Sequence, residues 1–377
     1  MSVSCPHRGL NLVRTRQPRL DIVRLSLPGS SRFFVTDAPG GDGGPEPLAA
    51  EIGDFLKQHG AHVAAMDLFG PTDRQAETLA ALERTCGPVK WPVTWIDGSA
   101  CAGKAPIAAQ FYAVAGPTRP VVLDGQVVGT IVEDDNMRFV VFAGLRPADV
   151  TASRGDQTKS LINQLERALD VVGMDFHNVV RTWLYCDRIL EWYDELNRVR
   201  NEFFRERGVY DRLVPASTGV GTGNPFGAAL VADALAMVPL KPGISVKSLP
   251  SPLQCPAPAY GSAFSRAVEI TLPGCRRLYI SGTASIHPEG ETAYVGDVDA
   301  QVDLSMRVVK GILDSVGYTW TDINRAVAYF KNPADAGAWD RWVKANNIPA
   351  MPIVVVKADI CRDDLLFEVE VDALRLT

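Results

Sequence analysis

The stretch Arg277-Leu278-Tyr279-Ile280-Ser281-Gly282, an apolar run closed by glycine, decides how this chain is organised. The same pattern occurs earlier as Arg138-Phe139-Val140-Val141-Phe142-Ala143-Gly144. An offset of 144 residues then separates Gln157 from Gln301, which open two helical stretches that both end in Val-Gly. Internal repetition on this scale indicates that each copy is one supersecondary unit.

The two copies continue to match beyond their helical stretches. The following strand carries Arg181 and Tyr185 in one copy and Arg325 and Tyr329 in the other. Both copies close with the tripeptide Asp-Ala-Leu, at 233–235 and at 372–374, which we take as equivalent positions.

A third, more divergent copy is predicted at the front of the chain. Its expected elements are a strand at 32–37, a helix at 47–60, a strand at 62–69, a helix at 72–86 and paired closing strands at 91–96 and 107–115. Apolar residues at helical spacing support the second helix. The sequence thus divides into three units, 1–118, 119–242 and 254–377, with Pro-rich or Gly-rich joints between them.

Each unit is expected to have an α+β fold. In the last copy we predict strands at 267–272, 278–284, 323–330, 353–358 and 365–374, and helices at 297–316 and 336–346. Two helices per unit would cover one face of a mixed sheet, and three sheets would pack around a shared centre. Small-molecule sites form preferentially in clefts between such units.

Composition excludes several classes of function. The net charge of −6 argues against nucleic acid as a partner, which requires a basic surface. No apolar run approaches the ~18 residues of a membrane helix, and the first twenty residues do not form a secretory signal. Seven cysteines without a CxxC pair indicate free thiols in a reducing cytoplasm.

The motifs of the repeated units resemble those of the reactive intermediate deaminases (RidA or YjgF proteins). The resemblance is carried by Ile280-Ser281-Gly282, Gln301, the run 323–329 and the run 367–373. Members of that family are homotrimers with active sites between subunits. The resemblance therefore implies that three fused copies form a pseudo-trimer, and that the chain is a monomer.

The middle and last copies also resemble the chorismatases, which remove pyruvate from chorismate. The runs 180–188, 213–221 and 361–368 carry this similarity. The simple deaminases have an arginine directly after a Pro-Ala pair, whereas this chain has Ser217 and Met351 there. Imine hydrolysis is therefore disfavoured, because the substrate carboxylate would lose its bidentate partner. The chorismatase resemblance implies chorismate as substrate and no cofactor.

Chorismate has two carboxylates, so its pocket needs two cationic anchors. We expect Arg181 and Arg188 to provide them, with Tyr185 in an aromatic wall beside Arg181. The alternative is that Arg188 pairs on the surface with Asp187 or Glu191. Arg325, the repeat equivalent of Arg181, is expected to be structural.

Cleavage of an enol ether requires an acid that protonates carbon near neutral pH. Alternation along the last strand places Glu368 and Glu370 on the face opposite Val369, and an apolar pocket raises the pKa of a carboxyl group. The resemblance favours Glu368 as this acid, with Glu370 as the alternative. Without the resemblance, acidic residues on one face of a strand would indicate that this face is exposed to solvent.

Product type in the chorismatases is associated with a small residue and a cysteine near the site, here Gly274 and Cys361. They favour the type that forms 3-hydroxybenzoate and pyruvate, although Cys361 also fits a buried apolar role and Gly274 a plain turn. The alternatives are a hydrolytic chorismatase, which yields a dihydroxycyclohexadiene carboxylate, and a non-catalytic metabolite-binding protein. A metal hydrolase is disfavoured, since the five histidines lack HxH or HExxH spacing.

Overall fold

The computed structural model describes residues 1–5, 9–37, 44–98 and 107–377. The first unit contains β1 (Ser2–Cys5), β2 (Leu10–Arg16), β3 (Leu20–Leu27), β4 (Ser30–Asp37), α1 (Pro45–His59), β5 (His62–Gly70), α2 (Gln75–Cys86), β6 (Val93–Asp97) and β7 (Ala108–Ala115). The second contains β8 (Thr118–Leu123), β9 (Gln126–Glu133), β10 (Met137–Leu145), α3 (Arg154–Val171), β11 (Val179–Cys186), α4 (Tyr193–Glu206), β12 (Ala216–Gly221) and β13 (Leu230–Pro239). The third contains β14 (Ser245–Leu249), β15 (Ala267–Leu272), β16 (Cys275–Ala284), α5 (Val298–Ser315), β17 (Ile323–Phe330), α6 (Gly337–Ala345), β18 (Ile353–Lys357) and β19 (Phe367–Leu376).

The three sheets share one strand order, which confirms the α+β repeat. The orders are β2-β3-β4-β7-β5-β6, β8-β9-β10-β13-β11-β12 and β14-β15-β16-β19-β17-β18, with β1 added at the edge of the first sheet. In each sheet one pair is parallel (β5 with β6, β11 with β12, β17 with β18) and the other pairs are antiparallel. The expected pairing of the first unit's closing strands is wrong, because β5 lies between β6 and β7.

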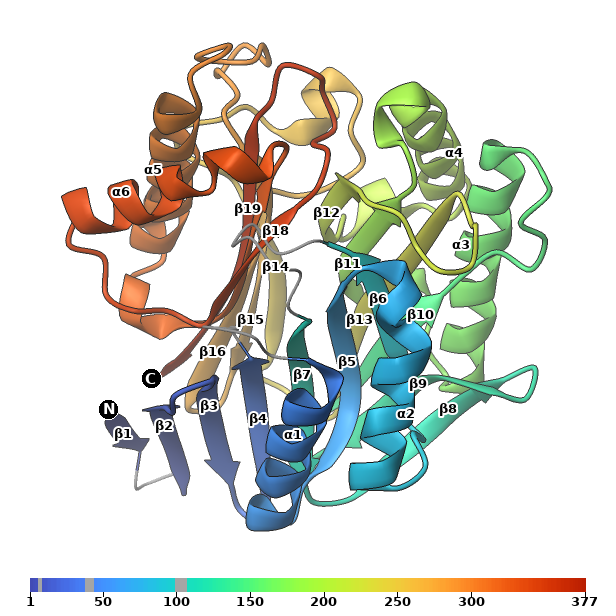
Figure 1. Ribbon diagram of the computed structural model, residues 1–377, viewed down its shortest axis with the longest axis vertical. Helices are drawn as coiled ribbons and strands as arrows, with labels where there is room; N and C mark the ends of the chain where they lie inside the picture. The colour runs from blue at the N-terminus through green and yellow to red at the C-terminus, as the bar shows by residue number, and fades with distance from the viewer. Residues whose placement is uncertain (6–8, 38–43, 99–106) are drawn as a thin grey trace.

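Each unit turns its helices outward and the other face of its sheet toward a common centre (Figure 1). Helix-facing side chains such as Val369 and Val371 pack with α5, whereas Tyr185, Tyr279 and Phe139 join one core shared by all three units. Because side chains alternate along a strand, the inward face of β19 carries the acidic residues. The fold therefore directs them to the places where units meet.

The repeated glutamine holds the segment that precedes the last strand of its unit. Gln301, in the first turn of α5, donates to the carbonyl of Asp364 at 2.9 Å and accepts from the amide of Leu366 at 2.8 Å. Gln157 accepts in the same way from the amide of Ala229 at 2.8 Å. These bonds join α5 to the segment before β19 and α3 to the segment before β13.

The two Asp-Ala-Leu tripeptides are not structurally equivalent. Arg181 lies opposite Leu235 in the second sheet, whereas its counterpart Arg325 lies opposite Asp372 in the third. Asp233 therefore corresponds to Glu370, two residues from the position that the sequence match indicates. A shift by two residues keeps each side chain on the same face, so the sequence pattern does not reveal it.

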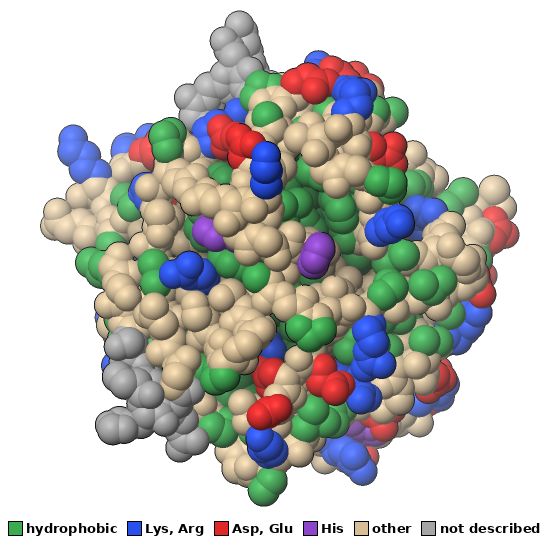
Figure 2. Space-filling model, turned by 90° about the horizontal axis from the view of Figure 1, so that it is seen from below, with side chains coloured by type: hydrophobic (Ala, Val, Ile, Leu, Met, Phe, Trp, Pro, Cys, Tyr) green, Lys and Arg blue, Asp and Glu red, His purple; other side chains and the backbone are tan. Residues whose placement is uncertain are grey.

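On the face seen in Figure 2, basic and acidic side chains are interspersed between hydrophobic ones. Of the helices within the described ranges, none is both long and apolar enough to span a bilayer.

Candidate active site

The second and third units meet along β12 and β16. The amide of Gly221 donates to the carbonyl of Asp359 at 2.7 Å, and the amide of Asp359 donates back at 2.8 Å. Nearby, the Ser281 hydroxyl accepts from the amide of Ser217 at 2.9 Å. Because main-chain hydrogen bonds hold this seam, the side chains on its two sides are fixed relative to one another.

A cavity with an empty volume of about 550 Å³ opens at this seam. Both units contribute to its wall, which consists of Tyr193, Arg200, Ser217, Gly219, Phe264, Arg266, Gly282, Ala284, Ile286, Cys361, Arg362 and Glu368. A larger and more open hollow adjoins it and shares Tyr193, Cys361 and Arg362. The structure thus brings the predicted acid and the predicted cysteine into one pocket.

Glu368 is the buried acid of this pocket, with 4% of its surface exposed. Burial raises its pKa to about 8, the neighbouring charge of Glu370 adds to this, and Arg181 and Arg266 oppose it. Its carboxyl group therefore retains its proton at neutral pH. Gly282 makes room for it, because a Cβ atom at that position would lie 1.9 Å from Oε1 of Glu368.

Cys361 lies in the segment between β18 and β19. Burial raises the pKa of its thiol to about 12, and the neighbouring Glu368 adds to this effect. Arg362 and a hydrogen bond with Tyr193 act in the opposite direction. At neutral pH the side chain is therefore a neutral thiol. It is not suited to act as a nucleophile, because nucleophilic cysteines need a lowered pKa.

Three guanidinium groups line the pocket, each from a different element. Arg200 of α4 donates to the carbonyl of Ala263 at 2.8 Å. Arg266, just before β15, donates to the carbonyl of Cys255 at 2.8 Å, and Arg362 donates to that of Gly290 at 2.7 Å. These main-chain contacts orient the three guanidinium groups at the pocket.

Sequence reasoning missed these three arginines. They lie on separate elements of two units, so no spacing links them. The one usable signal was that Arg362 directly follows Cys361.

Arg181 and Tyr185 lie deeper, in the centre of the molecule. Arg181 is fully buried, donates to the Thr218 hydroxyl at 2.6 Å and pairs with Glu370 at 3.0 Å. Tyr185 is 1% exposed within the shared core. Neither side chain is part of the pocket wall, although Arg181 acts on the pKa of Glu368.

Arg188 and Gly274 lie away from the pocket. Arg188 is a surface residue whose guanidinium pairs with Asp187 at 3.1 Å and with Glu191 at 3.6 Å. This is the surface arrangement that the sequence left open. Gly274 forms the turn between β15 and β16 with φ of 86°, a conformation that favours glycine. The structure therefore does not bring either residue to Glu368.

Glu370, the alternative acid, is held as a carboxylate. Its oxygens accept from Arg325 at 2.6 Å, from Trp183 Nε1 at 3.0 Å and from Arg181 at 3.0 Å. Burial acts to raise its pKa, but Arg325 and Arg181 together hold the pKa below the usual value. It lacks the proton that a general acid needs.

The corresponding positions in the other two units are apolar. Glu368 lies opposite Tyr329, and the same register places Val231 opposite Tyr185 and Ala108 opposite Phe69. The acidic side chain is therefore specific to the third unit.

Comparisons with known proteins agree with this architecture. A family model described as endoribonuclease L-PSP, which represents the RidA-like fold, matches residues 256–375. A crystal structure of a chorismatase superposes with a TM-score of 0.65 at 18% identity, covering 92% of this chain and 100% of that one. At this identity the likeness shows the fold, which is that of a protein with three fused RidA-like units.

Two curated relatives from Streptomyces hygroscopicus extend the comparison. A chorismatase is 25% identical over 248 residues, covering 60% of this chain and 67% of the relative. A 3-hydroxybenzoate synthase is 26% identical over 223 residues, covering 52% of this chain and 63% of the relative. The chain is thus similar to these two relatives over 60% and 52% of its length.

Proposed function

We propose that this protein is an enzyme that converts chorismate to 3-hydroxybenzoate and pyruvate. The observation that carries the proposal is a buried carboxyl group, Glu368, with its pKa raised to about 8 in a pocket that three arginines line. An acid that keeps its proton next to anchors for anions suits a substrate with two carboxylates and an acid-labile enol ether. The names of the two relatives support the same substrate.

Arg200, Arg266 and Arg362 replace the two anchors that the sequence suggested. Arginine binds carboxylates through paired N–H donors, and donors from separate elements suit carboxylates at opposite ends of a ring. Phe264 and Ile286, also in the wall, offer apolar contacts for the ring.

Glu368 would act as the general acid. Proton transfer to the methylene carbon of the enolpyruvyl group places positive charge on the ether-bearing carbon. Arg181 and Arg266 oppose the rise in the pKa of Glu368, because they stabilise the carboxylate that remains after the proton has been transferred. The substrate would thus become a reactive cation within the pocket.

The fate of that cation sets the product. Capture by the substrate's own ring hydroxyl leads to 3-hydroxybenzoate and pyruvate, which together contain the atoms of chorismate with no added water. Capture by water gives the dihydroxycyclohexadiene carboxylate. Cys361 is a neutral thiol in the pocket wall, and we propose that it favours the intramolecular course by occupying space with a weakly polar group.

One chain supplies both walls of this pocket, and we propose that it works as a cytoplasmic monomer. In the described part of the chain, no group of three or more His, Cys, Asp or Glu side chains is arranged to hold a metal.

The decisive experiment is incubation with chorismate, followed by identification of the products by mass and retention time. Formation of 3-hydroxybenzoate with equimolar pyruvate is the expected result. The diene diol in its place would establish the hydrolytic course. Binding of chorismate without pyruvate would instead indicate a metabolite-binding protein and refute the enzymatic proposal.

A further inference from the structure

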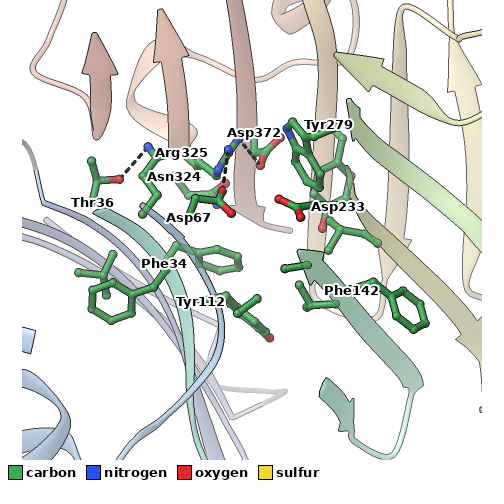
Figure 3. Close-up of a pocket in the computed structure, with 18 of the residues that line it drawn as sticks. Phe34, Thr36, Asp67, Tyr112, Phe142, Asp233, Tyr279, Asn324, Arg325 and Asp372 are labelled. Carbon is green, nitrogen blue, oxygen red and sulfur yellow. Dashed lines mark hydrogen bonds and ion pairs between the residues drawn. The ribbon is translucent and has the colours of Figure 1, made fainter. Parts of the chain in front are cut away.

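A second cavity lies at the centre of the molecule, where the inner faces of the three sheets meet (Figure 3). Its empty volume is about 650 Å³, and it shares no wall residue with the seam pocket. All three units contribute aromatic rings to it, namely Phe34, Tyr112, Phe139, Trp183 and Tyr279. Rings from three units give this cavity a largely apolar wall.

Several buried polar atoms on this wall have no partner within the described protein. They are Oε1 of Gln110, the hydroxyl of Tyr112 and Oδ1 of Asp372. These side chains are 3%, 8% and 5% exposed, respectively. Leaving a polar group unpaired in the interior is costly, and two of the three atoms are pure acceptors. The cavity is therefore suited to a ligand that donates hydrogen bonds.

Acidic groups outnumber cations around the cavity. Asp67, Asp233 and Asp372 line it together with one guanidinium, Arg325. That guanidinium is already shared, since it binds Glu370 at 2.6 Å and Asp67 at 3.3 Å.

Acidic groups still outnumber guanidiniums when the residues directly behind the cavity wall are included. Arg181 and Glu370 lie behind the wall as an ion pair. Arg277 lies 5.2 Å from the ring centroid of Phe139. Four acids (Asp67, Asp233, Glu370 and Asp372) therefore face three guanidiniums (Arg181, Arg277 and Arg325).

Burial raises the pKa of two of these acids, Asp67 and Asp233, and each carboxyl group acts on the other. A buried acid without a matching cation is neutralised either by a proton or by the positive charge of a ligand.

We propose that this central cavity binds a small primary ammonium compound with a compact apolar body. The ammonium group offers three N–H donors to the acceptors of Gln110, Tyr112 and Asp372. The apolar body packs against the aromatic rings, whose faces attract cations. The inference rests on this cavity alone and is independent of the chemistry proposed for the seam pocket, whose arginines favour anions.

Isothermal titration calorimetry with benzylamine tests the proposal, with benzyl alcohol and benzoate as neutral and anionic probes of the same ring. Benzylamine is expected to bind saturably and at least about tenfold more tightly than either analogue. Asp372→Asn removes the charge, and Ala65→Leu fills the space, because Ala65 is part of the wall. Each is expected to weaken benzylamine binding by about tenfold or more. Asp340→Asn on the exposed face of α6 is the matched control and should bind like wild type.

Tyr112→Phe provides a milder variant should Asp372→Asn fold poorly, and thermal unfolding of each variant checks folding. Binding that persists unchanged in folded Asp372→Asn and Ala65→Leu, or equal binding of benzoate, overturns the proposal, as does the absence of saturable binding in wild type. Glu368→Gln should retain benzylamine binding, and Ala65→Leu should retain pyruvate release. The proposal for the central cavity and the proposal for the seam pocket can thus be refuted independently.

Discussion

Arg181 and Glu370 form a fully buried ion pair between the second and third units, with 3.0 Å between Nη2 and Oε2. The second oxygen of Glu370 accepts from Trp183 and Arg325. One carboxylate thus links the inner face of the second sheet to that of the third. Because Glu370 is committed to this pair, the proton-bearing carboxyl in the neighbouring pocket is Glu368.

Glu370→Gln is expected to destabilise the protein rather than to alter its chemistry. The substitution leaves the buried Arg181 guanidinium without its carboxylate, whereas Arg325 keeps Asp67, and breaking a buried pair in this way costs about 3–5 kcal/mol. Chemical denaturation of the variant and wild type measures the difference. A loss well below 1 kcal/mol would contradict the structural role.

Glu368→Gln is expected to lower pyruvate release by at least ~10², the range for loss of general acid catalysis. The amide keeps the size of the side chain but lacks the acidic proton. Chorismate binding, followed by calorimetry, should persist. Near-normal release of pyruvate would rule out Glu368 as the acid.

The rate of pyruvate release should fall as pH rises through about 8, where Glu368 loses its proton. Stability should respond as well. The folded pKa lies above the ordinary value of 4.5, so the folded state keeps a proton that the unfolded chain has released. Wild type should therefore lose stability relative to Glu368→Gln as pH rises from about 4.5 to about 8. A difference that is constant over this window would contradict the raised pKa.

Arg266→Ala and Arg362→Ala are each expected to weaken chorismate binding by about 2–5 kcal/mol, because a buried substrate carboxylate would lose its charge partner. Arg188→Ala is the control and should leave KM unchanged, because its side chain is 64% exposed and pairs with Asp187. Since both pocket arginines also bind main-chain carbonyls, unfolding temperatures should accompany the kinetics. A raised KM in Arg188→Ala alone would instead support Arg188 as an anchor for a substrate carboxylate.

Cys361→Ala is expected to retain pyruvate release while shifting products from 3-hydroxybenzoate toward the diene diol. In the wild-type protein the thiol should react slowly with iodoacetamide at neutral pH, because its pKa is raised to about 12. Product ratios by chromatography and peptide mapping by mass spectrometry provide the two measurements. An unchanged ratio would leave Cys361 as an ordinary pocket-wall residue.

The local pattern of the last unit was predictable because it depends on neighbours in sequence. Strands expected at 267–272 and 323–330 are found as β15 (Ala267–Leu272) and β17 (Ile323–Phe330). Alternation along β19 placed Glu368 on the inward face. Strands β1 to β3 of the first unit were not predicted from the sequence, although β3 corresponds to β15 in the shared strand order.

The sequence alone determined the repeat, the α+β units and the face on which Glu368 lies, since hydrophobic periodicity and chain spacing are local properties. Tertiary structure decided which charges meet. Arg181 finds its partner Glu370 189 residues later in the chain. Arg200, Arg266 and Arg362 converge from elements that no spacing relates. An arginine becomes either an anchor or half of a buried pair according to the carboxylate brought opposite it, and only the packing of the three sheets sets that distance.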